Sequence, residues 1–340
     1  MREGKFITLG IETSCDDTAL ALLEGPKTAI RDVISSQIAD HSPFGGVVPE
    51  LASRKHQEAF LPLLRSLFSK AGMTPDEVDL IAVTAGPGLM GSLLVGVMSA
   101  KALAQAWGKP LIGVNHLEGH IFANILAGTG LAPPFLCLIV SGGHTEIVLA
   151  KEEGKYALMG TTRDDAAGEA YDKAAKAMGL GYPGGPVIER LACGGNARAF
   201  DFPVALKDSR EVEFSFSGLK TALRTAVQRI KDSGAGLPVA DICASFQRAV
   251  TESLMRKARM AVRKTGVRRF AISGGVAANS SLREALESEA KRAGWEAFIP
   301  SRGYCTDNAM MIAAAGYSAF MRGERSDLSL APDPSWEIWG

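Results

Sequence analysis

Two stretches of the chain share one pattern, in which an apolar run is followed by a short polar loop and a second apolar run. The first spans residues 6–23 around the polar segment 12–17, and the second spans 135–149 around 141–144. Apolar runs of this length predict buried β-strands, so each stretch predicts a hairpin with a polar tip. Because the plan occurs twice, the pattern indicates an internally duplicated α/β fold, with two unrelated hairpins as the alternative.

The remaining apolar residues predict further helices and strands. Helices are predicted over 57–71, 93–107, 166–178, 240–264 and a segment ending near 231. Short apolar runs predict strands at 79–84, 111–114, 156–160, 270–272 and 297–299. Glycine-rich turns at 85–92, 141–143 and 273–279 follow predicted strands, where free backbone N–H groups can bind an anion. We predict that another glycine-rich stretch, 179–186, is a connecting loop.

Length and composition predict two domains. The chain has 340 residues, of which 46% are hydrophobic and 22% are charged, which is typical of a globular protein with cores of about 100–200 residues each. A proline-containing link at 132–134 is the predicted boundary. We expect an N-terminal lobe over 1–132, a C-terminal lobe over 133–305, a helical segment over 306–325 whose first turn contains a carboxylate, and a tail over 326–340.

The balance of charge restricts the partners. Lysine plus arginine and aspartate plus glutamate number 37 each, so net charge gives no general attraction to nucleic acid or to an anionic membrane. A polyanion would have to bind a local patch. The best candidate is the basic face of the helix over 240–264 and the residues just beyond it: Arg256, Lys257, Arg259, Arg263, Lys264, Arg268 and Arg269. A solvated helix face is the alternative.

Cysteine usage and hydropathy indicate the compartment. Five scattered cysteines without a C-x-x-C pair argue against a disulfide framework and a structural zinc site. The N-terminal segment lacks the apolar core and cleavage site of a signal peptide. The most apolar long stretch, 93–107, is interrupted by Ser99, Lys101 and Gln105. We therefore expect a cytoplasmic protein that does not bind a membrane.

Two of the five histidines, His116 and His120, are four residues apart. On a helix capped by Asn115, this spacing places both imidazoles on one face, where they can bind a divalent metal together with a third ligand from elsewhere. Two unrelated histidines on a surface helix are the alternative. Glu118 follows His116 by two positions, so at about 100° per residue it points away from a shared metal. A zinc peptidase of the H-E-x-x-H class is therefore a poor fit.

Several short motifs occur in one order along the chain. They are IETSCD at 11–16, GPGL at 86–89, NHLEGH at 115–120, VSGGHT at 140–145, YPGGP at 182–186, SGGV at 273–276 and TDNA at 306–309. The repeated hairpins and the late Gly-Gly turn resemble the actin, hexokinase and Hsp70 superfamily. More narrowly, residues 7–321 resemble the bacterial TsaD (Gcp/YgjD) family of tRNA adenosine threonylcarbamoyltransferases. The resemblance implies two duplicated lobes with a nucleotide cleft between them, to which the segment over 306–325 returns.

The resemblance implies an activity and its requirements. The threonylcarbamoyl group of threonylcarbamoyl-AMP would be transferred to the exocyclic amine of the adenosine 3′ of the anticodon in tRNAs reading ANN codons, and AMP would be released. His116, His120 and Asp307 would bind one divalent metal, Fe(II) in the family's usual assignment, with Zn(II) as a rival. The partners would be tRNA, a TsaB-like paralogue and a TsaE-like ATPase, and a separate synthase would supply threonylcarbamoyl-AMP.

The resemblance also implies an adenine nucleotide site. The phosphate would be bound by the backbone of Ile139, Val140, Ser141, Gly142 and Gly143, and the nucleoside by Asp172, Gly185, Glu189 and Asn279. Asp16 and Asp17 are candidates to remove the proton of the adenine amine. The family commonly has Cys-Asp-Glu where this chain has Cys15-Asp16-Asp17, and often has Asp at position 189.

Two other classes remain open. A small-molecule kinase of the same superfamily would explain the nucleotide loops, but it leaves the histidine pair and Asp307 without a role. A catalytically silent scaffold paralogue would not need the metal-binding residues.

Overall fold

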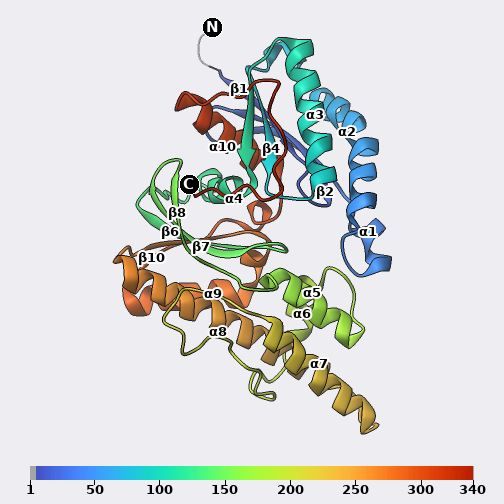
Figure 1. Cartoon of the computed structure of the whole chain (residues 1–340), viewed down its shortest axis with the longest axis vertical. Coiled ribbons are helices and arrows are strands. Elements are labelled where there is room, and N and C mark those ends of the chain that lie inside the picture. Colours follow the sequence, from blue (N-terminus) through green and yellow to red (C-terminus); the bar gives the residue numbers. More distant parts are fainter. Residues whose placement is uncertain (1–4, 340) are drawn as a thin grey trace. The chain divides into compact units, whose positions relative to one another are not determined.

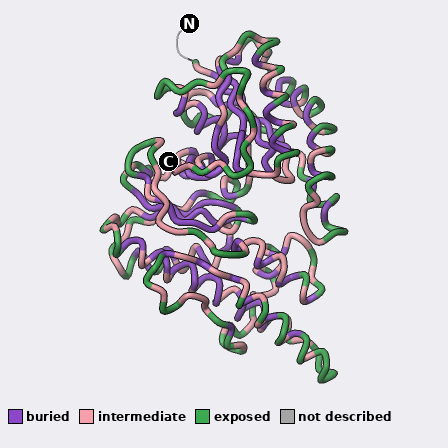
Figure 2. Tube along the Cα trace, in the orientation of Figure 1, coloured by how far each residue is buried: buried purple, intermediate pink, exposed green. Residues whose placement is uncertain are grey.

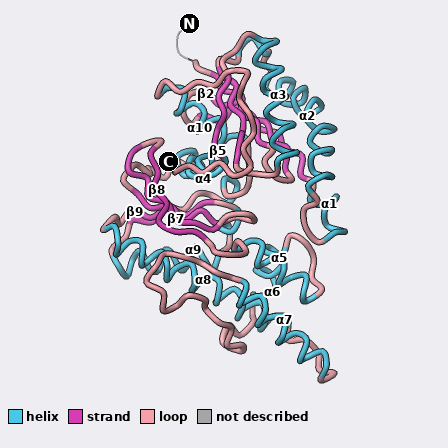
Figure 3. Tube along the Cα trace, viewed as in Figure 1, coloured by secondary structure: helices cyan, strands magenta, loops and turns pink. Residues whose placement is uncertain are grey.

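The computed structural model describes residues 5–339 (Figure 1). The chain divides into two compact units. The first consists of Met1–Gly130 together with Thr306–Gly340, and the second is Leu131–Cys305. Each unit is built around its own five-stranded sheet and has a hydrophobic core of its own. Figure 3 shows the strands in magenta and the helices in cyan.

The sheet of the first unit has the order β3-β2-β1-β4-β5. Its strands are β1 (Ile7–Glu12), β2 (Asp17–Glu24), β3 (Thr28–Ser36), β4 (Leu80–Gly86) and β5 (Leu111–Asn115). The strands β1, β2 and β3 form an antiparallel meander, whereas β4 and β5 run parallel to β1. The first predicted hairpin is therefore confirmed as β1 and β2.

Helices cover both faces of this sheet. They are α1 (Ile38–His41), α2 (Pro49–Ala71), α3 (Met90–Trp107), α4 (His116–Leu126) and α10 (Ala309–Met321), with short 3-10 turns at Ser42–Phe44 and Pro75–Glu77. Leu9 and Ile11 of β1 share one core with Phe60 of α2 and Val97 of α3. Because side chains alternate along a strand, Gly10 faces the opposite side, where α10 packs.

The sheet of the second unit has the order β10-β9-β6-β7-β8. Its strands are β6 (Phe135–Val140), β7 (Thr145–Glu152), β8 (Lys155–Thr161), β9 (Arg269–Ser273) and β10 (Glu296–Phe298). Its helices are α5 (Ala167–Met178), α6 (Gly184–Ala192), α7 (Ser217–Asp232), α8 (Val239–Thr265) and α9 (Ser280–Ala293), with 3-10 turns at Gly275–Ala278 and Arg302–Tyr304. The inner strands of both sheets, such as β1, β4, β6 and β9, are largely buried, whereas the edge strands β3 and β8 are mostly exposed or half-buried (Figure 2).

The two units repeat one topology. In each, an antiparallel meander of three strands is extended by two strands that run parallel to the first strand of the meander. The predicted duplication is thereby confirmed. Among residues 5–339, no helix is long and apolar enough to cross a membrane.

The prediction of a loop over 179–186 is wrong at its end, because α6 begins at Gly184. A Cβ atom at Gly184 would lie 2.5 Å from the carbonyl oxygen of Tyr171 and 2.7 Å from the Cα of Asp172. This glycine therefore permits close packing of α6 on α5. Glycine and proline at the start of a helix concealed it from pattern analysis.

The segment before and after Asp307 also differs from prediction. We expected the carboxylate in the first turn of a helix, but α10 begins at Ala309 and is capped by Asn308, whose side chain accepts from the Met311 N–H. Asp307 lies just outside the helix. Residues 326–339 of the predicted tail contain no helix or strand but are hydrogen-bonded to the rest of the first unit, for example from Asp333 N to the Ala85 carbonyl at 2.8 Å.

Lys257 and Arg259, two of the seven basic residues in the predicted polyanion surface, are held by the protein itself, whereas Arg263, Lys264 and Arg268 are exposed, so that surface stays a prediction. Lys257 is buried at 1% exposure, and its ammonium group donates to the carbonyls of Leu206 and Glu211, both at 2.9 Å. Arg259 is paired with Glu289 at 3.0 Å. Both side chains therefore form contacts within the second unit. The alternative, that this helix face is solvated, does not hold for Lys257, because it is buried.

Candidate functional site

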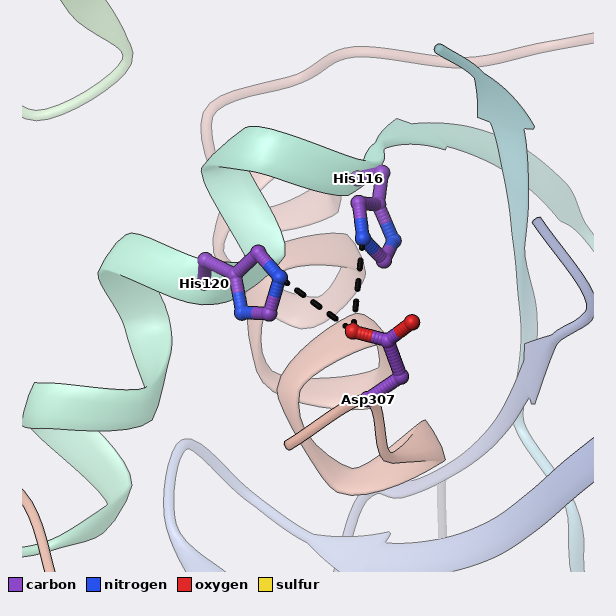
Figure 4. Close-up of side chains that lie close together, drawn as sticks. All are labelled: His116, His120 and Asp307. Carbon is purple, nitrogen blue, oxygen red and sulfur yellow. Dashed lines mark ion pairs between the residues drawn. The ribbon is translucent and has the colours of Figure 1, made fainter. Parts of the chain in front are cut away.

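The predicted histidine helix is present as α4. It begins at His116, directly after β5, and the Asn115 side chain caps it by accepting from the Leu117 N–H at 2.9 Å. His116 and His120 lie one turn apart on the same face, with ring centroids 4.7 Å apart. Figure 4 shows both imidazoles directed toward the Asp307 carboxylate, which comes from the segment just before α10.

The three side chains form a compact group of ligand atoms. Asp307 Oδ1 lies 3.5 Å from His116 Nε2 and 3.3 Å from His120 Nε2, and one ligand atom of each residue falls within 4.8 Å of the others. Atoms that share one ion at about 2.0–2.2 Å lie roughly 3.0–3.5 Å apart. The two nitrogen–oxygen distances match that spacing, so this group could hold a metal ion.

The environment of His120 is the clearest evidence that this group binds a metal ion. It is fully buried, and within residues 5–339 neither of its ring nitrogens makes a hydrogen bond. A buried polar atom without a hydrogen bond costs about 1–3 kcal/mol. A metal ion bound at Nε2 would satisfy one of these nitrogens and offset that cost.

Sequence reasoning missed two residues that contact the other ring nitrogen of His116, Glu12 and Ser14, and a third, Thr84, that contacts Glu12. The buried Glu12 carboxylate accepts from His116 Nδ1 at 2.9 Å and from the Thr84 hydroxyl at 2.6 Å. The Ser14 hydroxyl lies 3.2 Å from the same His116 nitrogen. The available signal was a carboxylate at the end of an otherwise apolar strand. Glu12 and His116 are 104 residues apart in sequence, so their contact depends on the fold.

The contact between His116 and Glu12 favours the charged form of both side chains. Burial lowers the pKa of His116, but the Glu12 and Asp307 carboxylates outweigh it and raise that pKa to about 9. Burial raises the pKa of Glu12, and the His116 charge and hydrogen bond outweigh it and lower that pKa. Metal binding at His116 must therefore displace a proton, which weakens binding at low pH.

Asp16 and Asp17 lie at the tip of the first hairpin. Burial raises the pKa of both carboxyls, and for Asp17 the nearby Asp16 charge adds to this effect and the pKa reaches about 6, despite a hydrogen bond from Ser36. The backbone of the tip is fixed from outside, since His56 Nε2 donates to the Cys15 carbonyl at 3.0 Å. The tip is thus an ordered segment with two acidic groups.

The second hairpin presents the predicted phosphate loop. Ile139 and Val140 are fully buried residues of β6, whereas Gly142 and Gly143 lie exposed at the tip. The Ser141 N–H donates to the His144 carbonyl at 2.8 Å, which closes the turn. The Gly168 N–H donates to the Ser141 carbonyl at 3.1 Å, so the N-terminus of α5 packs on this loop.

The other predicted nucleotide residues gather on α5, α6 and the start of α9. Asp172 Oδ1 accepts from the N–H of Gly184, next to Gly185. Glu189 Oε1 accepts from the N–H and hydroxyl of Ser280 at 2.9 and 2.6 Å, which places it beside Asn279. The structure therefore places Asp172 near Gly185 and Glu189 near Asn279, all within the second unit.

Glu118 is separate from the metal-binding group, as the helical geometry predicts. Its carboxylate lies 3.6 Å from the guanidinium of Arg322, which follows α10. A general base for a metal-bound water is thus missing from the position that the H-E-x-x-H pattern requires.

The two sheets and the buried group define the class of this protein. The paired five-stranded sheets form the fold of the actin, hexokinase and Hsp70 superfamily, and the first unit adds a His–His–Asp group that could hold a metal. Full-length HypF in its phosphate- and nucleotide-bound form matches with a TM-score of 0.59 over 95% of this chain and 47% of the HypF chain, at 14% identity. That similarity shows a shared fold.

Sequence comparison identifies the family. The family model for TsaD, tRNA N6-adenosine threonylcarbamoyltransferase, matches residues 28–314. The chain is 54% identical over 333 residues to the enzyme of that name from Anaeromyxobacter sp. (strain Fw109-5), covering 97% of this chain and 99% of the relative. It is 53% identical over 322 residues to that from Syntrophobacter fumaroxidans, covering 93% and 95%. The chain therefore belongs to the TsaD family and is a tRNA N6-adenosine threonylcarbamoyltransferase.

Proposed function

We propose that the donor is threonylcarbamoyl-AMP, that the acceptor is the adenosine 3′ of the anticodon in tRNAs reading ANN codons, and that AMP is released. We also propose that His116, His120 and Asp307 bind one divalent metal, Fe(II) in preference to Zn(II). The observation that supports the metal site most strongly is His120, which is fully buried with both ring nitrogens lacking a hydrogen bond within residues 5–339. Two histidines and a carboxylate suit either ion.

The protein's own residues have two tasks in this reaction besides holding the metal. When bound, the metal would act as a Lewis acid that polarises or positions the threonylcarbamoyl group. The AMP phosphate is already a good leaving group, so the protein must orient the weakly nucleophilic adenine amine and remove its proton. Asp17, with a pKa of about 6, is ionised at neutral pH and can accept that proton, with Asp16 as the neighbouring alternative.

The second unit would bind the adenylate. Its phosphate would contact the exposed backbone at Gly142 and Gly143 and the rest of the 139–143 segment. The ribose would contact Asp172, Gly185 and Glu189, whose grouping on α5 and α6 supports this assignment. Asn279 would line the base, although its side chain also caps α9 by accepting from the Leu282 N–H.

We propose a TsaB-like paralogue and a TsaE-like ATPase as protein partners, with a separate synthase supplying the donor. A stripe of exposed apolar side chains on α3 supports a protein partner: Met90, Leu94 and Met98 are 52, 47 and 53% exposed and lie one turn apart. Such a stripe is unusual on a surface that remains in water. Because tRNA is the substrate, we place the reaction in the cytoplasm.

The test is reconstitution with the two partners, threonylcarbamoyl-AMP and unmodified tRNA, followed by mass spectrometry of the nucleosides. We expect modified adenosine with the wild-type protein and its loss, together with bound metal, in His116→Ala and Asp307→Ala. Glu118→Gln is the matched control, because it changes a carboxylate on the same helix that is paired with Arg322.

The assay also separates the alternatives. If tRNA stays unmodified while a small substrate is phosphorylated from ATP, the kinase interpretation holds. If His116→Ala and Asp307→Ala both keep full activity without bound metal, the metal site is rejected. The assignment of threonylcarbamoyl-AMP as donor and tRNA as acceptor would still stand.

A further inference from the structure

Three parallel strands of the first sheet end side by side. β1 is paired with β4, and β4 with β5, in the register Ile11 to Val83 and Thr84 to Val114. Because the carboxyl ends of parallel strands meet at one edge of a sheet, the residues that follow lie close together. Glu12 ends β1, Thr84 lies near the end of β4, and His116 follows β5.

The Glu12 carboxylate is surrounded by hydrogen-bond donors at this edge. It is 1% exposed. Its Oε2 accepts from the Thr84 hydroxyl at 2.6 Å and from His116 Nδ1 at 2.9 Å, and its Oε1 accepts from the Ser14 N–H at 2.5 Å. Of these three partners, His116 is the one that also belongs to the group that could hold a metal ion.

A carboxylate only accepts hydrogen bonds, so the His116 nitrogen that faces it must be the one with the proton. In the neutral imidazole that binds a metal, the lone pair then lies on Nε2, which is 3.5 Å from Asp307 Oδ1. We propose that Glu12 is a positioning residue, which fixes the orientation and tautomer of His116 and so raises the affinity of the His116–His120–Asp307 group for a divalent metal.

General experience with metal-binding histidines supports this role. A carboxylate on the second ring nitrogen fixes the ring and increases the basicity of the ligating nitrogen, and its loss typically weakens metal binding by about 10- to 100-fold. The inference rests on the metal site proposed above and not on the transfer reaction. It concerns a residue outside the His116–His120–Asp307 group.

The Ser14 hydroxyl also lies near His116 Nδ1, but its geometry makes it a weaker partner than the Glu12 carboxylate. Ser14 Oγ lies 3.2 Å from His116 Nδ1, a longer contact than the one from Glu12, and it has no charge. Hydrogen bonds to an ionised acceptor are roughly twice as strong as those between neutral groups. Ser14→Ala should therefore change metal affinity much less than a substitution at Glu12.

The experiment is a titration of metal-free protein with Co²⁺, followed by its visible absorption, for the wild type, Glu12→Gln, Glu12→Ala, Ser14→Ala and the control Glu118→Gln. We expect one ion per wild-type chain, a 10- to 100-fold loss of affinity for both Glu12 variants, and affinities within about threefold of wild type for the other two. Thermal unfolding of each metal-free variant shows that it is folded.

A second readout reports the tautomer directly. In Zn²⁺-loaded wild type, ¹⁵N-edited NMR of the histidines should show a slowly exchanging proton on His116 Nδ1, and Glu12→Ala should lose that protection. If both Glu12 variants bind Co²⁺ as wild type does, or if the His116 proton is on Nε2, the inference is wrong although the metal site stands. If wild type binds no Co²⁺, the metal site and the inference both fail, while nucleoside analysis of tRNA still tests the transferase. If neither Glu12 variant folds, the wild-type NMR decides.

Discussion

Gly10 lies where β1 meets the start of α10, so its replacement by alanine should disturb both packing and metal binding. A Cβ atom at this position would lie 2.1 Å from the Ala309 carbonyl oxygen and 2.9 Å from the Ala313 backbone nitrogen. Close carbon–oxygen contacts in proteins are about 3.3–3.6 Å. Because the obstructing atoms are backbone, the helix and the strand must separate by about 1 Å.

The expected loss of stability follows from this overlap. Overpacking of this kind costs about 1–3 kcal/mol. In a unit of this size each kcal/mol lowers the melting temperature by about 2–4 °C, so Gly10→Ala should melt about 2–12 °C below wild type. Differential scanning calorimetry of the metal-free protein measures this shift.

Metal binding should weaken as well. Asp307 precedes Ala309 by two residues and contributes one of the three ligand atoms. Metal–ligand distances tolerate only about ±0.2 Å, so a shift of the helix start should lower Co²⁺ affinity by about tenfold or more. Gly316→Ala is the matched control: it crowds the same helix against Ala82 Cβ at 2.4 Å, but two turns away from Asp307. It should lose stability and keep near wild-type affinity. The reasoning would be refuted if Gly10→Ala had the melting temperature and Co²⁺ affinity of wild type. It would also be refuted if Gly10→Ala and Gly316→Ala lost Co²⁺ affinity equally.

Three further predictions concern single side chains. Lys257→Met removes an ammonium group that donates to two backbone carbonyls, so the free energy of unfolding measured in urea should fall by about 1.5–3 kcal/mol. Lys231→Met is the control, because Lys231 is exposed and its loss should have little effect. Equal urea midpoints for the two variants would contradict the argument from burial. The folded protein raises the pKa of Asp17 from 3.8 to about 6, so ionisation destabilises the fold as pH rises through that window. Asp17→Asn should therefore melt above wild type at pH 7, with the difference disappearing near pH 4; a constant difference would show that ionisation is not its cause. Glu118→Gln should keep Co²⁺ affinity and lose less than about 1 kcal/mol from its pair with Arg322; loss of the metal would reopen the peptidase interpretation.

The strands that pattern analysis identified are those with continuous apolar runs. β1 and β6 are buried along their whole length; β6 is apolar throughout, and β1 has Ile7, Leu9 and Ile11 at alternate positions, so the signal is strong. The edge strand β3 was missed, because Val33 is the one fully buried residue among its nine and most of the others are exposed. The helix α6 was missed because glycine and proline occupy its first turn, where they serve packing on α5.

The candidate site shows a similar division. The spacing of His116 and His120 is local, so the sequence predicts their shared helix face and the direction of Glu118. Asp307 was assigned by resemblance to a family, since no local pattern links it to the histidines. Glu12 was missed altogether, because its role depends on the register that brings the ends of β1, β4 and β5 together.

The most direct test of this account is the location of the metal itself. Crystals of the protein loaded with one equivalent of Zn²⁺ would be measured above and below the zinc absorption edge, which locates the ion independently of activity. We predict a single anomalous peak about 2.0–2.2 Å from His116 Nε2, His120 Nε2 and a carboxylate oxygen of Asp307. A peak bound elsewhere, or none at these three residues, would contradict the metal site on which the account depends.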